Sequence, residues 1–271
     1  MGWGEIAAFA AGVAAAGIAS GLLAGIFGIG GGAVLVPVFF QVFEMLAVDD
    51  GVRMHLAVGS SLAIIIPTAI SSFRGHRARG AVDEAVLRSY LVPVPAGVVL
   101  ASLVAAVISS EGLRFVFAAI AALVGLRLLF NREHWRLGAA LPGGWGRGLA
   151  GVVIGFFSTL MGIGGGVLNN TFMTLYGRPM HQAVATSAGV GMLIAIPGAL
   201  GYVWAGWGHP DLPVFSTGFV NWLAVALVIP LALVFTPVGV RIAHGASKRQ
   251  LEIGFGLFCL FVSTRFIWSL L

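Results

Sequence analysis

Long apolar runs separated by short polar stretches make up most of this chain. A helix needs roughly 20 mainly apolar residues to cross about 30 Å of hydrocarbon. Eight runs of that length predict membrane-spanning helices, over residues 5–26, 55–73, 86–108, 113–130, 146–163, 183–205, 219–241 and 250–270. Two shorter runs, 33–46 and 167–176, each follow a cluster of glycines. A helix rises only about 1.5 Å per residue, so we expect short spans or re-entrant half-helices there.

Four segments of the first half recur in the same order in the second half. The pairs are "GIFGIGGGAVL" (25–35) with "TLMGIGGGVLN" (159–169), "MHLAVGSS" (54–61) with "MHQAVATS" (180–187), "IPTAI" (66–70) with "IPGAL" (196–200), and the apolar segments that begin at Leu113 and Leu251. Such self-similarity is typical of a duplicated unit. It predicts a first membrane repeat over residues 1–130, a linker over 131–147 and a second membrane repeat over 148–271.

The basic residues of the loops predict how these two repeats are oriented. The loop after 55–73 reads "RGHRARG", whereas its counterpart after 183–205, "GWGHPDLPVFSTG", contains no Lys or Arg. A second pair of equivalent loops, "SSEG" and "RIAHGASKRQ", has the opposite bias. Short loops rich in Lys and Arg stay in the cytoplasm. Equivalent loops are therefore expected on opposite sides, which predicts inverted repeats of about five helical segments each, a cytoplasmic linker and both termini in the periplasm.

The composition supports a protein that lies in the bilayer. Of the 271 residues 59% are hydrophobic and 9% are charged, against roughly 25% charged residues in a soluble domain. Residues 1–10 contain Glu5 and neither Lys nor Arg, so the first run is expected to be a retained span rather than a cleaved signal peptide. The fold class is therefore predicted to be an all-α polytopic membrane protein.

The charges and the cysteine content exclude some classes of partner and site. The formal net charge of +5 comes mainly from arginines in loops. The sequence has no basic face with interleaved aromatic residues, so no nucleic acid partner is expected. Cys259 is the single cysteine, which excludes disulfides and cysteine metal sites within one chain. We expect a lipid bilayer as the environment and no cofactor or metal, and association as a homodimer stays open.

The glycine clusters are the main candidates for a binding site. Backbone that leaves a helix inside lipid is tolerated only where it is buried in protein or lines a wet cavity. Glycines before a helix free backbone N–H groups, and with the positive end of the helix dipole these form an anion site. Short, glycine-led helices in inverted halves are typical of a transporter's site at the midplane. The predicted substrate-binding glycines are Gly28, Gly30, Gly31, Gly32, Gly162, Gly164, Gly165 and Gly166.

Two other interpretations of the glycines compete with this one. Glycine also lets membrane helices approach each other closely, so the clusters could serve packing alone. The segment "GIGGGA" imitates a dinucleotide-binding fingerprint, but no strand, helix and strand unit surrounds it.

Polar side chains inside the apolar runs extend the predicted site. Asn169 and Asn170 are adjacent amides in a short apolar segment, and leaving them in lipid would cost several kcal/mol. We expect them to face the cavity, although their counterparts Leu35 and Val36 are apolar, so the site cannot be symmetric. Four hydroxyls either line the pore or bond to their own helix backbone. These are Ser60, Ser61, Thr186 and Ser187.

Titratable residues are weaker candidates. His55 and His181 occupy equivalent positions on opposite faces, where each could attract an anion, take a proton or simply pack at the interface. Glu44 is a carboxylate near the core and a candidate for proton coupling. Arg127 and Arg265 fall near the ends of their spans, where long side chains reach the lipid headgroups.

The paired motifs "GIFGIGGGAVLVP" and "TLMGIGGGVLNN" resemble those of the sulfite exporter TauE/SafE family, and the resemblance covers nearly the whole chain. It implies a bacterial inner-membrane permease for a small inorganic or organic sulfur anion: sulfite, thiosulfate, a sulfonate or sulfoacetate. Pro37 matches the proline that closes the first motif, whereas its counterpart is Thr171. That departure leaves the substrate contacts of the second half open.

The function expected from these features is secondary transport of such an anion by alternating access. A passive anion channel is the alternative, and flux that saturates and is competed would distinguish transport from it. An intramembrane enzyme would need a nucleophile with a base, or a metal cluster, in the core. Cys259 is isolated and the histidines lie on opposite faces, so no enzyme activity is expected.

Overall fold

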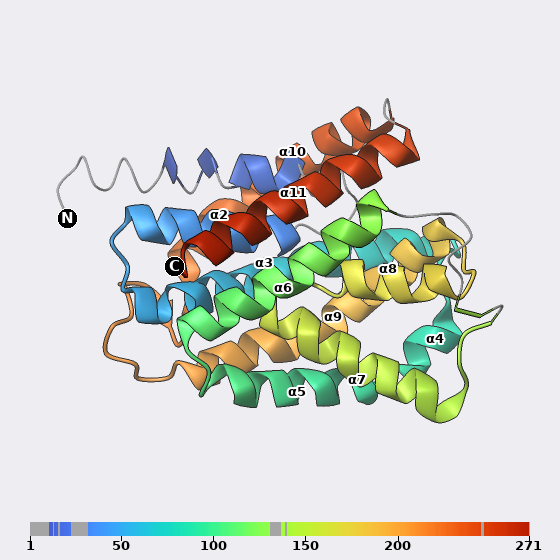
Figure 1. Cartoon of the computed structure of the whole chain (residues 1–271), viewed down its shortest axis with the longest axis horizontal. Coiled ribbons are helices and arrows are strands. Elements are labelled where there is room, and N and C mark those ends of the chain that lie inside the picture. The colour runs from blue at the N-terminus through green and yellow to red at the C-terminus, as the bar shows by residue number, and fades with distance from the viewer. Residues whose placement is uncertain are drawn as a thin grey trace.

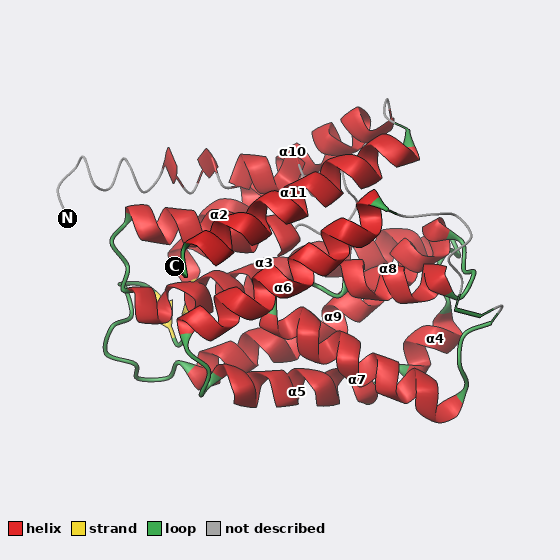
Figure 2. Cartoon of the chain, in the orientation of Figure 1, coloured by secondary structure: helices red, strands yellow, loops and turns green. Residues whose placement is uncertain are grey.

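The computed structural model describes residues 11–12, 14–15, 17–22, 32–130, 137–138, 140–244 and 247–270. The described chain is almost entirely helical, with one two-stranded hairpin (Figures 1 and 2). Its elements are α2 (Gly32–Met45), α3 (Asp50–Ala78), α4 (Glu84–Ser89), α5 (Pro93–Ala105), α6 (Ser110–Leu129), α7 (Gly144–Leu160), α8 (Gly166–Leu175), α9 (Met180–Ala205), β1 (Ser216–Thr217), β2 (Val220–Asn221), α10 (Trp222–His244) and α11 (Lys248–Trp268). The predicted all-α fold class is confirmed.

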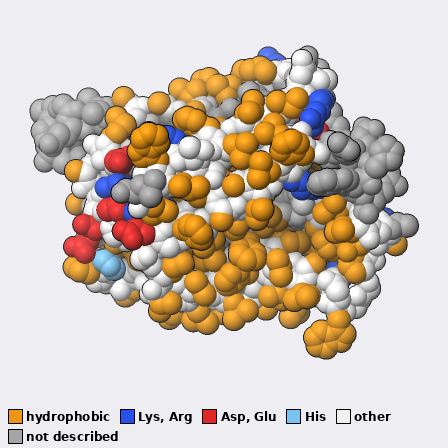
Figure 3. Space-filling view, viewed as in Figure 1, with side chains coloured by type: hydrophobic (Ala, Val, Ile, Leu, Met, Phe, Trp, Pro, Cys, Tyr) orange, Lys and Arg blue, Asp and Glu red, His pale blue; other side chains and the backbone are white. Residues whose placement is uncertain are grey.

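Five helices in the described part of the chain are long and apolar enough to cross a membrane. They are α3, α6, α9, the Trp222–Gly239 part of α10 and the Arg249–Trp268 part of α11. Hydrophobic side chains cover the middle of the molecule, while charged side chains lie towards its two ends (Figure 3). Large apolar side chains such as Leu123, Leu200 and Phe261 are exposed. An apolar belt between charged ends fits a multi-pass membrane protein.

The two short helices expected after the glycine clusters are present. The predicted segments 33–46 and 167–176 correspond to α2 and α8. Most of the first glycine cluster lies outside the described residues, as does most of the predicted span 5–26.

The expected single span over 86–108 is wrong, because the chain breaks there into α4 and α5. Pro93 occupies the first turn of α5, where its missing N–H does no harm, but it cannot continue a helix from α4. Asp83 caps α4 by accepting a hydrogen bond from the Val86 N–H. α5 has only 13 residues, or roughly 20 Å of helix. It is therefore shorter than a full crossing.

The helices pack in pairs around α3 and α9. These two long helices lie against each other through the core, and α6 and α11 form a second pair. α5 packs against α7 and α9, α2 lies along α3, and α8 lies along α9. Residues 17–22 are helical and pack on α10, since a Cβ built at Gly17 would lie 2.9 Å from the Leu231 Cβ. α8 packs mainly on α9 and touches α7.

Glycines let α3 and α9 approach each other closely. A Cβ at Gly198 would come within 3.1 Å of Leu62 Cδ1, and one at Gly191 within 3.4 Å of the Ala69 Cβ. The contact partner of Leu62 in α9 comes later in the sequence than the contact partner of Ala69. The two helices are therefore antiparallel. Each also contains an internal proline, Pro67 or Pro197, which removes one backbone hydrogen bond from its helix.

Candidate functional site

The chain turns sharply between α7 and α8 at the second glycine cluster. Gly162 has a φ of +64° and Gly165 a φ of +74°, in the left-handed region that glycine adopts at little cost. A Cβ at Gly165 would also lie 2.6 Å from Ile194 Cδ1. The left-handed backbone therefore favours glycine at position 165, and a larger residue would also have to displace the end of the Ile194 side chain.

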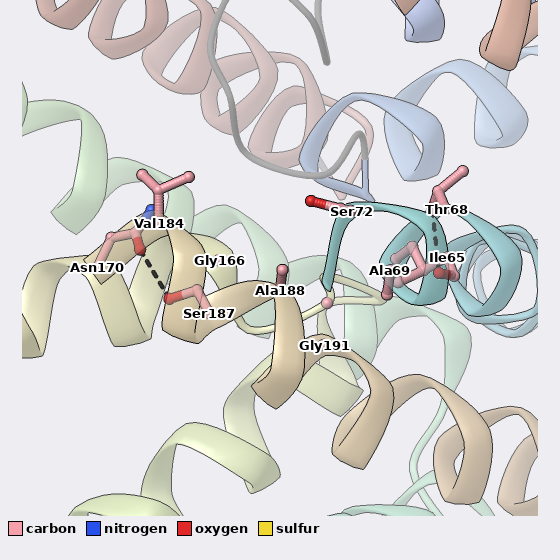
Figure 4. Close-up of a pocket in the computed structure, with 11 residues that line it drawn as sticks. Ile65, Thr68, Ala69, Ser72, Gly166, Asn170, Val184, Ser187, Ala188 and Gly191 are labelled. Carbon is pink, nitrogen blue, oxygen red and sulfur yellow. Dashed lines mark hydrogen bonds between the residues drawn. The ribbon is translucent and has the colours of Figure 1, made fainter. Parts of the chain in front are cut away.

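A small cavity lies where this turn meets α3 and α9 (Figure 4). Its volume is about 60 Å³, enough for a few waters or a small anion. Its lining residues are Ile65, Thr68, Ala69, Ser72, Gly164, Gly166, Asn170, Val184, Ser187, Ala188 and Gly191. None of these eleven described residues carries a charge.

The start of α8, where the first N–H groups lack partners within the helix, lies at this cavity. The N-cap residue Gly165 forms no side-chain cap, and the first bond of the helix runs from the Asn169 N–H to the Gly165 carbonyl. The N–H groups that precede it in α8 have no partner within the helix. One of them belongs to Gly166, which lines the cavity. Such donors, at the positive end of the helix dipole, favour an anion.

Three polar residues singled out from the sequence come together beside the cavity. Asn169 Nδ2 donates to Ser187 Oγ at 2.7 Å, and Ser187 Oγ donates to Asn170 Oδ1 at 2.7 Å. Asn170 and Ser187 line the cavity, whereas Asn169 is fully buried and is not among the lining residues. The amide oxygen of Asn169 has no hydrogen-bond partner.

The other three predicted hydroxyls hold the backbone and do not line the cavity. Ser61 Oγ donates to the Gly162 carbonyl at 2.8 Å and so fastens the left-handed turn to α3. Ser60 Oγ accepts from the Asn221 N–H at 3.0 Å, and Thr186 Oγ1 accepts from the Asp83 N–H at 2.9 Å. A direct role of these hydroxyls in substrate binding stays a prediction.

The beginning of α2 meets the second glycine cluster directly. A Cβ at Gly32 would lie 2.7 Å from the Gly162 carbonyl oxygen and 2.9 Å from the Ile163 Cα. Gly32 therefore serves close packing between the two clusters, and it is not among the residues that line the cavity. Gly28, Gly30 and Gly31 lie outside the described residues.

The titratable candidates lie away from the cavity lining. His55 is buried, and its ring lies tilted against that of Phe219 with centroids 4.6 Å apart. His181 is exposed at the start of α9. Glu44 is exposed, and its carboxylate lies 3.7 Å from the Arg53 guanidinium. Their roles in gating or proton coupling stay predictions.

Comparison with known proteins decides the family. The model of the sulfite exporter TauE/SafE family matches residues 13–266. The chain belongs to this family. Family and fold together support a multi-pass membrane transporter, and the resemblance noted in the sequence is confirmed.

Three relatives have similar lengths. A probable membrane transporter protein of Haemophilus influenzae is 28% identical over 247 residues, covering 91% of this chain and 94% of the relative. The probable membrane transporter protein MJ0441 of Methanocaldococcus jannaschii is 28% identical over 242 residues, 86% of each chain. The probable membrane transporter protein YunE of Bacillus subtilis is 23% identical over 272 residues, 93% of this chain and 95% of the relative. No solved structure matches the chain.

In this TauE/SafE protein, part of the cavity lining was missed from the sequence. Thr68 and Ser72 line it from the second half of α3. Hydroxyls four residues apart share one helix face, and that spacing is visible in the printed sequence. The Thr68 hydroxyl bonds to the Ile64 and Ile65 carbonyls of its own helix. Ser72 is exposed at the edge of the cavity.

Proposed function

We propose that this TauE/SafE protein is a secondary transporter of a small sulfur-containing anion: sulfite, thiosulfate, a sulfonate or sulfoacetate. It acts by alternating access in the bacterial inner membrane. The observation that carries the proposal is the cavity at the start of α8, whose described lining is uncharged and includes the Gly166 backbone and the Asn170 and Ser187 side chains. The sulfur comes from the family, and the negative charge follows from the donors.

Neutral donors suit a substrate that has to enter and leave. A lysine or arginine in a dry cavity would bind an anion tightly, and the empty site would then hold an unpaired charge. Backbone N–H groups and an amide contribute hydrogen bonds and dipoles without that cost. The described lining offers no carboxylate to coordinate a cation.

Inverted repeats, which alternating access commonly uses, are supported by the helix pairs. In the proposed repeat α3 corresponds to α9 and α6 to α11, and each of these helices packs against its own counterpart. Likewise α7 corresponds to the helix that contains residues 17–22, and α10 to α4 with α5. The α5–α7 contact then corresponds to the contact of residues 17–22 with α10.

Two crossed helix caps support the same symmetry. Asp83 caps α4 through the Val86 N–H, and Asn221 Oδ1 accepts from the Ala224 N–H at the start of α10. The Asp83 N–H donates to Thr186 in the second half, while the Asn221 N–H donates to Ser60 in the first. Ser60 and Thr186 are partners in the repeat "MHLAVGSS" and "MHQAVATS". Each half thus supplies the hydroxyl that holds the corresponding cap of the other.

The proposed orientation places the cavity on the cytoplasmic side. Its lining residues 65–72 belong to the second half of α3, which leads into the segment "RGHRARG". At the opposite end the Phe219 backbone packs on Gly59, and its ring covers His55. This arrangement fits an inward-facing conformation, with residues 131–147 as a cytoplasmic linker and the termini in the periplasm.

Flux in liposomes tests the proposal. Purified protein is expected to move sulfite with a rate that saturates and that thiosulfate competes. Gly165→Leu should abolish flux, because the side chain would need a left-handed backbone and would meet Ile194. Gly75→Leu is the matched control, since nothing lies within 4 Å of a Cβ there, and it should transport normally.

The outcomes separate three functions. Flux that rises linearly with concentration and is not competed would indicate a channel. Absence of sulfur-anion flux in the wild type would overturn the substrate class. Normal rates in a folded Gly165→Leu variant would show that the α8 turn is not part of the pathway.

A further inference from the structure

A buried relay of two hydrogen bonds beside the cavity fixes the orientation of the Asn170 amide. The Ser187 hydroxyl accepts from Asn169 Nδ2 and donates to Asn170 Oδ1. A serine hydroxyl has one proton, so once it accepts from Asn169 its own proton goes to Asn170. Asn170 is thereby held with its amide oxygen towards Ser187 (Figure 4).

The other end of the Asn170 amide has no partner among the described residues. Asn170 is 7% exposed and lines the cavity. Its oxygen is taken by Ser187, which leaves the Nδ2 group and its two N–H donors. No described residue accepts from this group, so a ligand in the cavity that accepts hydrogen bonds would give it a partner.

We propose that Asn169 and Ser187 are positioning residues, which hold Asn170 so that the cavity meets its ligand with N–H donors. The site then selects oxyanions that carry no proton, such as sulfonates and the sulfite or thiosulfate dianions. It disfavours anions of the same shape that retain an O–H. The inference rests on the proposed function, because it assumes that the cavity holds a sulfur oxyanion.

The relay makes the opposite amide orientation costly. A flipped Asn170 would offer its oxygen to a ligand O–H, but it would turn Nδ2 towards Ser187. The Ser187 proton would then need another acceptor, which the Asn169 amide could supply only by turning as well and giving up its Nδ2 contact with Met173 Sδ at 3.4 Å. Gly166, the first residue of α8, also lines this cavity, and its N–H has no partner within the helix.

Two ligands of the same charge, only one of which retains an O–H, test this inference. Methanesulfonate and methylphosphonate have closely similar shapes. At a pH at which methylphosphonate carries one negative charge, the charges are also equal, and only methylphosphonate retains an O–H. Competition against labelled sulfite gives the affinity ratio of the pair. We expect the wild type to bind methanesulfonate about tenfold more tightly, since the extra O–H would face a donor.

Variants of the relay should change this ratio. Ser187→Ala is expected to lower it about threefold or more, because nothing then fixes the Asn170 amide. Asn169→Ala should act in the same direction through the same relay and serves if Ser187→Ala does not fold. Ser187→Thr keeps the hydroxyl and should restore the wild-type ratio.

A buried hydroxyl outside the site provides the matched control. Ser263 is 3% exposed and donates to the Ala118 carbonyl at 2.8 Å, between α6 and α11. Ser263→Ala removes the same group and should leave the ratio unchanged.

Each outcome decides between the two proposals. A wild-type ratio near one would overturn the relay, as would an unchanged ratio in folded Ser187→Ala and Asn169→Ala proteins. Absence of binding of sulfite and methanesulfonate to the wild type would instead overturn the proposed function. A ratio that falls in the relay variants and stays constant in Ser263→Ala supports the inference.

Discussion

Arg114 carries a positive charge although it is only 4% exposed. Its guanidinium donates to Asp50 Oδ2 at 2.6 Å and to the Ser269 carbonyl at 3.3 Å, and it lies over the Phe40 ring. A buried charge is stable only when paired and hydrogen-bonded. This one side chain therefore ties the start of α3 to α6 and to the end of α11.

Removing the partner of this arginine should destabilise the protein. Asp50→Ala leaves the guanidinium largely unpaired. Breaking a fully buried pair costs about 3–5 kcal/mol, but the Asp50 side chain is 49% exposed, so we expect about 2 kcal/mol. Unfolding in mixed detergent micelles measures the change.

An exposed ion pair serves as the reference for this prediction. Arg77 and Glu84 lie 2.9 Å apart with side chains 63% and 39% exposed, so Glu84→Ala should cost less than about 1 kcal/mol. Equal losses in the two variants would contradict the assignment of Arg114 as a structural tie.

Single residues of the cavity were only partly visible in the sequence. Asn170 stood out because an amide in an apolar run needs a reason to be there, and the structure places it at the cavity. Thr68 and Ser72 were missed because hydroxyls near the end of a predicted span resemble an ordinary interface. The direction of the relay depends on contacts across 17 and 18 residues, which residue spacing alone does not provide.

At the scale of elements, the sequence predicted helices best where glycine or an abrupt polar change marks their ends. α2 and α8 were found in this way. The break between α4 and α5 was missed because only Arg88 and Ser89 interrupt the apolar residues there, and hydropathy does not register the missing N–H of Pro93. The hairpin before α10 was missed because its strands have two residues each.

The contact between α3 and the hairpin gives an element-level prediction. A Cβ at Gly59 would overlap the Phe219 carbonyl, and overpacking costs about 1–3 kcal/mol. Gly59→Ala should therefore lower the thermal stability. It should also perturb the end of the molecule that holds Phe219.

The same helix contains the control for this substitution. Gly75 lies in α3 with nothing within 4 Å of a Cβ. Gly75→Ala should be neutral or stabilise by up to about 1 kcal/mol, because alanine favours a helix. Thermal shifts of the same sign in the two variants would argue against a tight contact at Gly59.

For the whole molecule, the proposed inversion predicts which loops share a side. In a Cys259→Ser background, Gly75→Cys and Pro210→Cys place single thiols in exposed segments, which the proposed topology puts on opposite sides of the membrane. A membrane-impermeant maleimide should label Pro210→Cys in intact cells and Gly75→Cys only after disruption. Labelling of both thiols from the same side of the membrane would contradict the inverted topology.

The crossed helix caps have a consequence for folding during synthesis. The Asp83 N–H donates to Thr186, which lies 103 residues further along the chain and is therefore synthesised later. The start of α4 is therefore incomplete while the first half alone has left the ribosome. Two fragments cut within residues 131–147 should mature only when both are produced in the same cell, each acting as the other's folding partner.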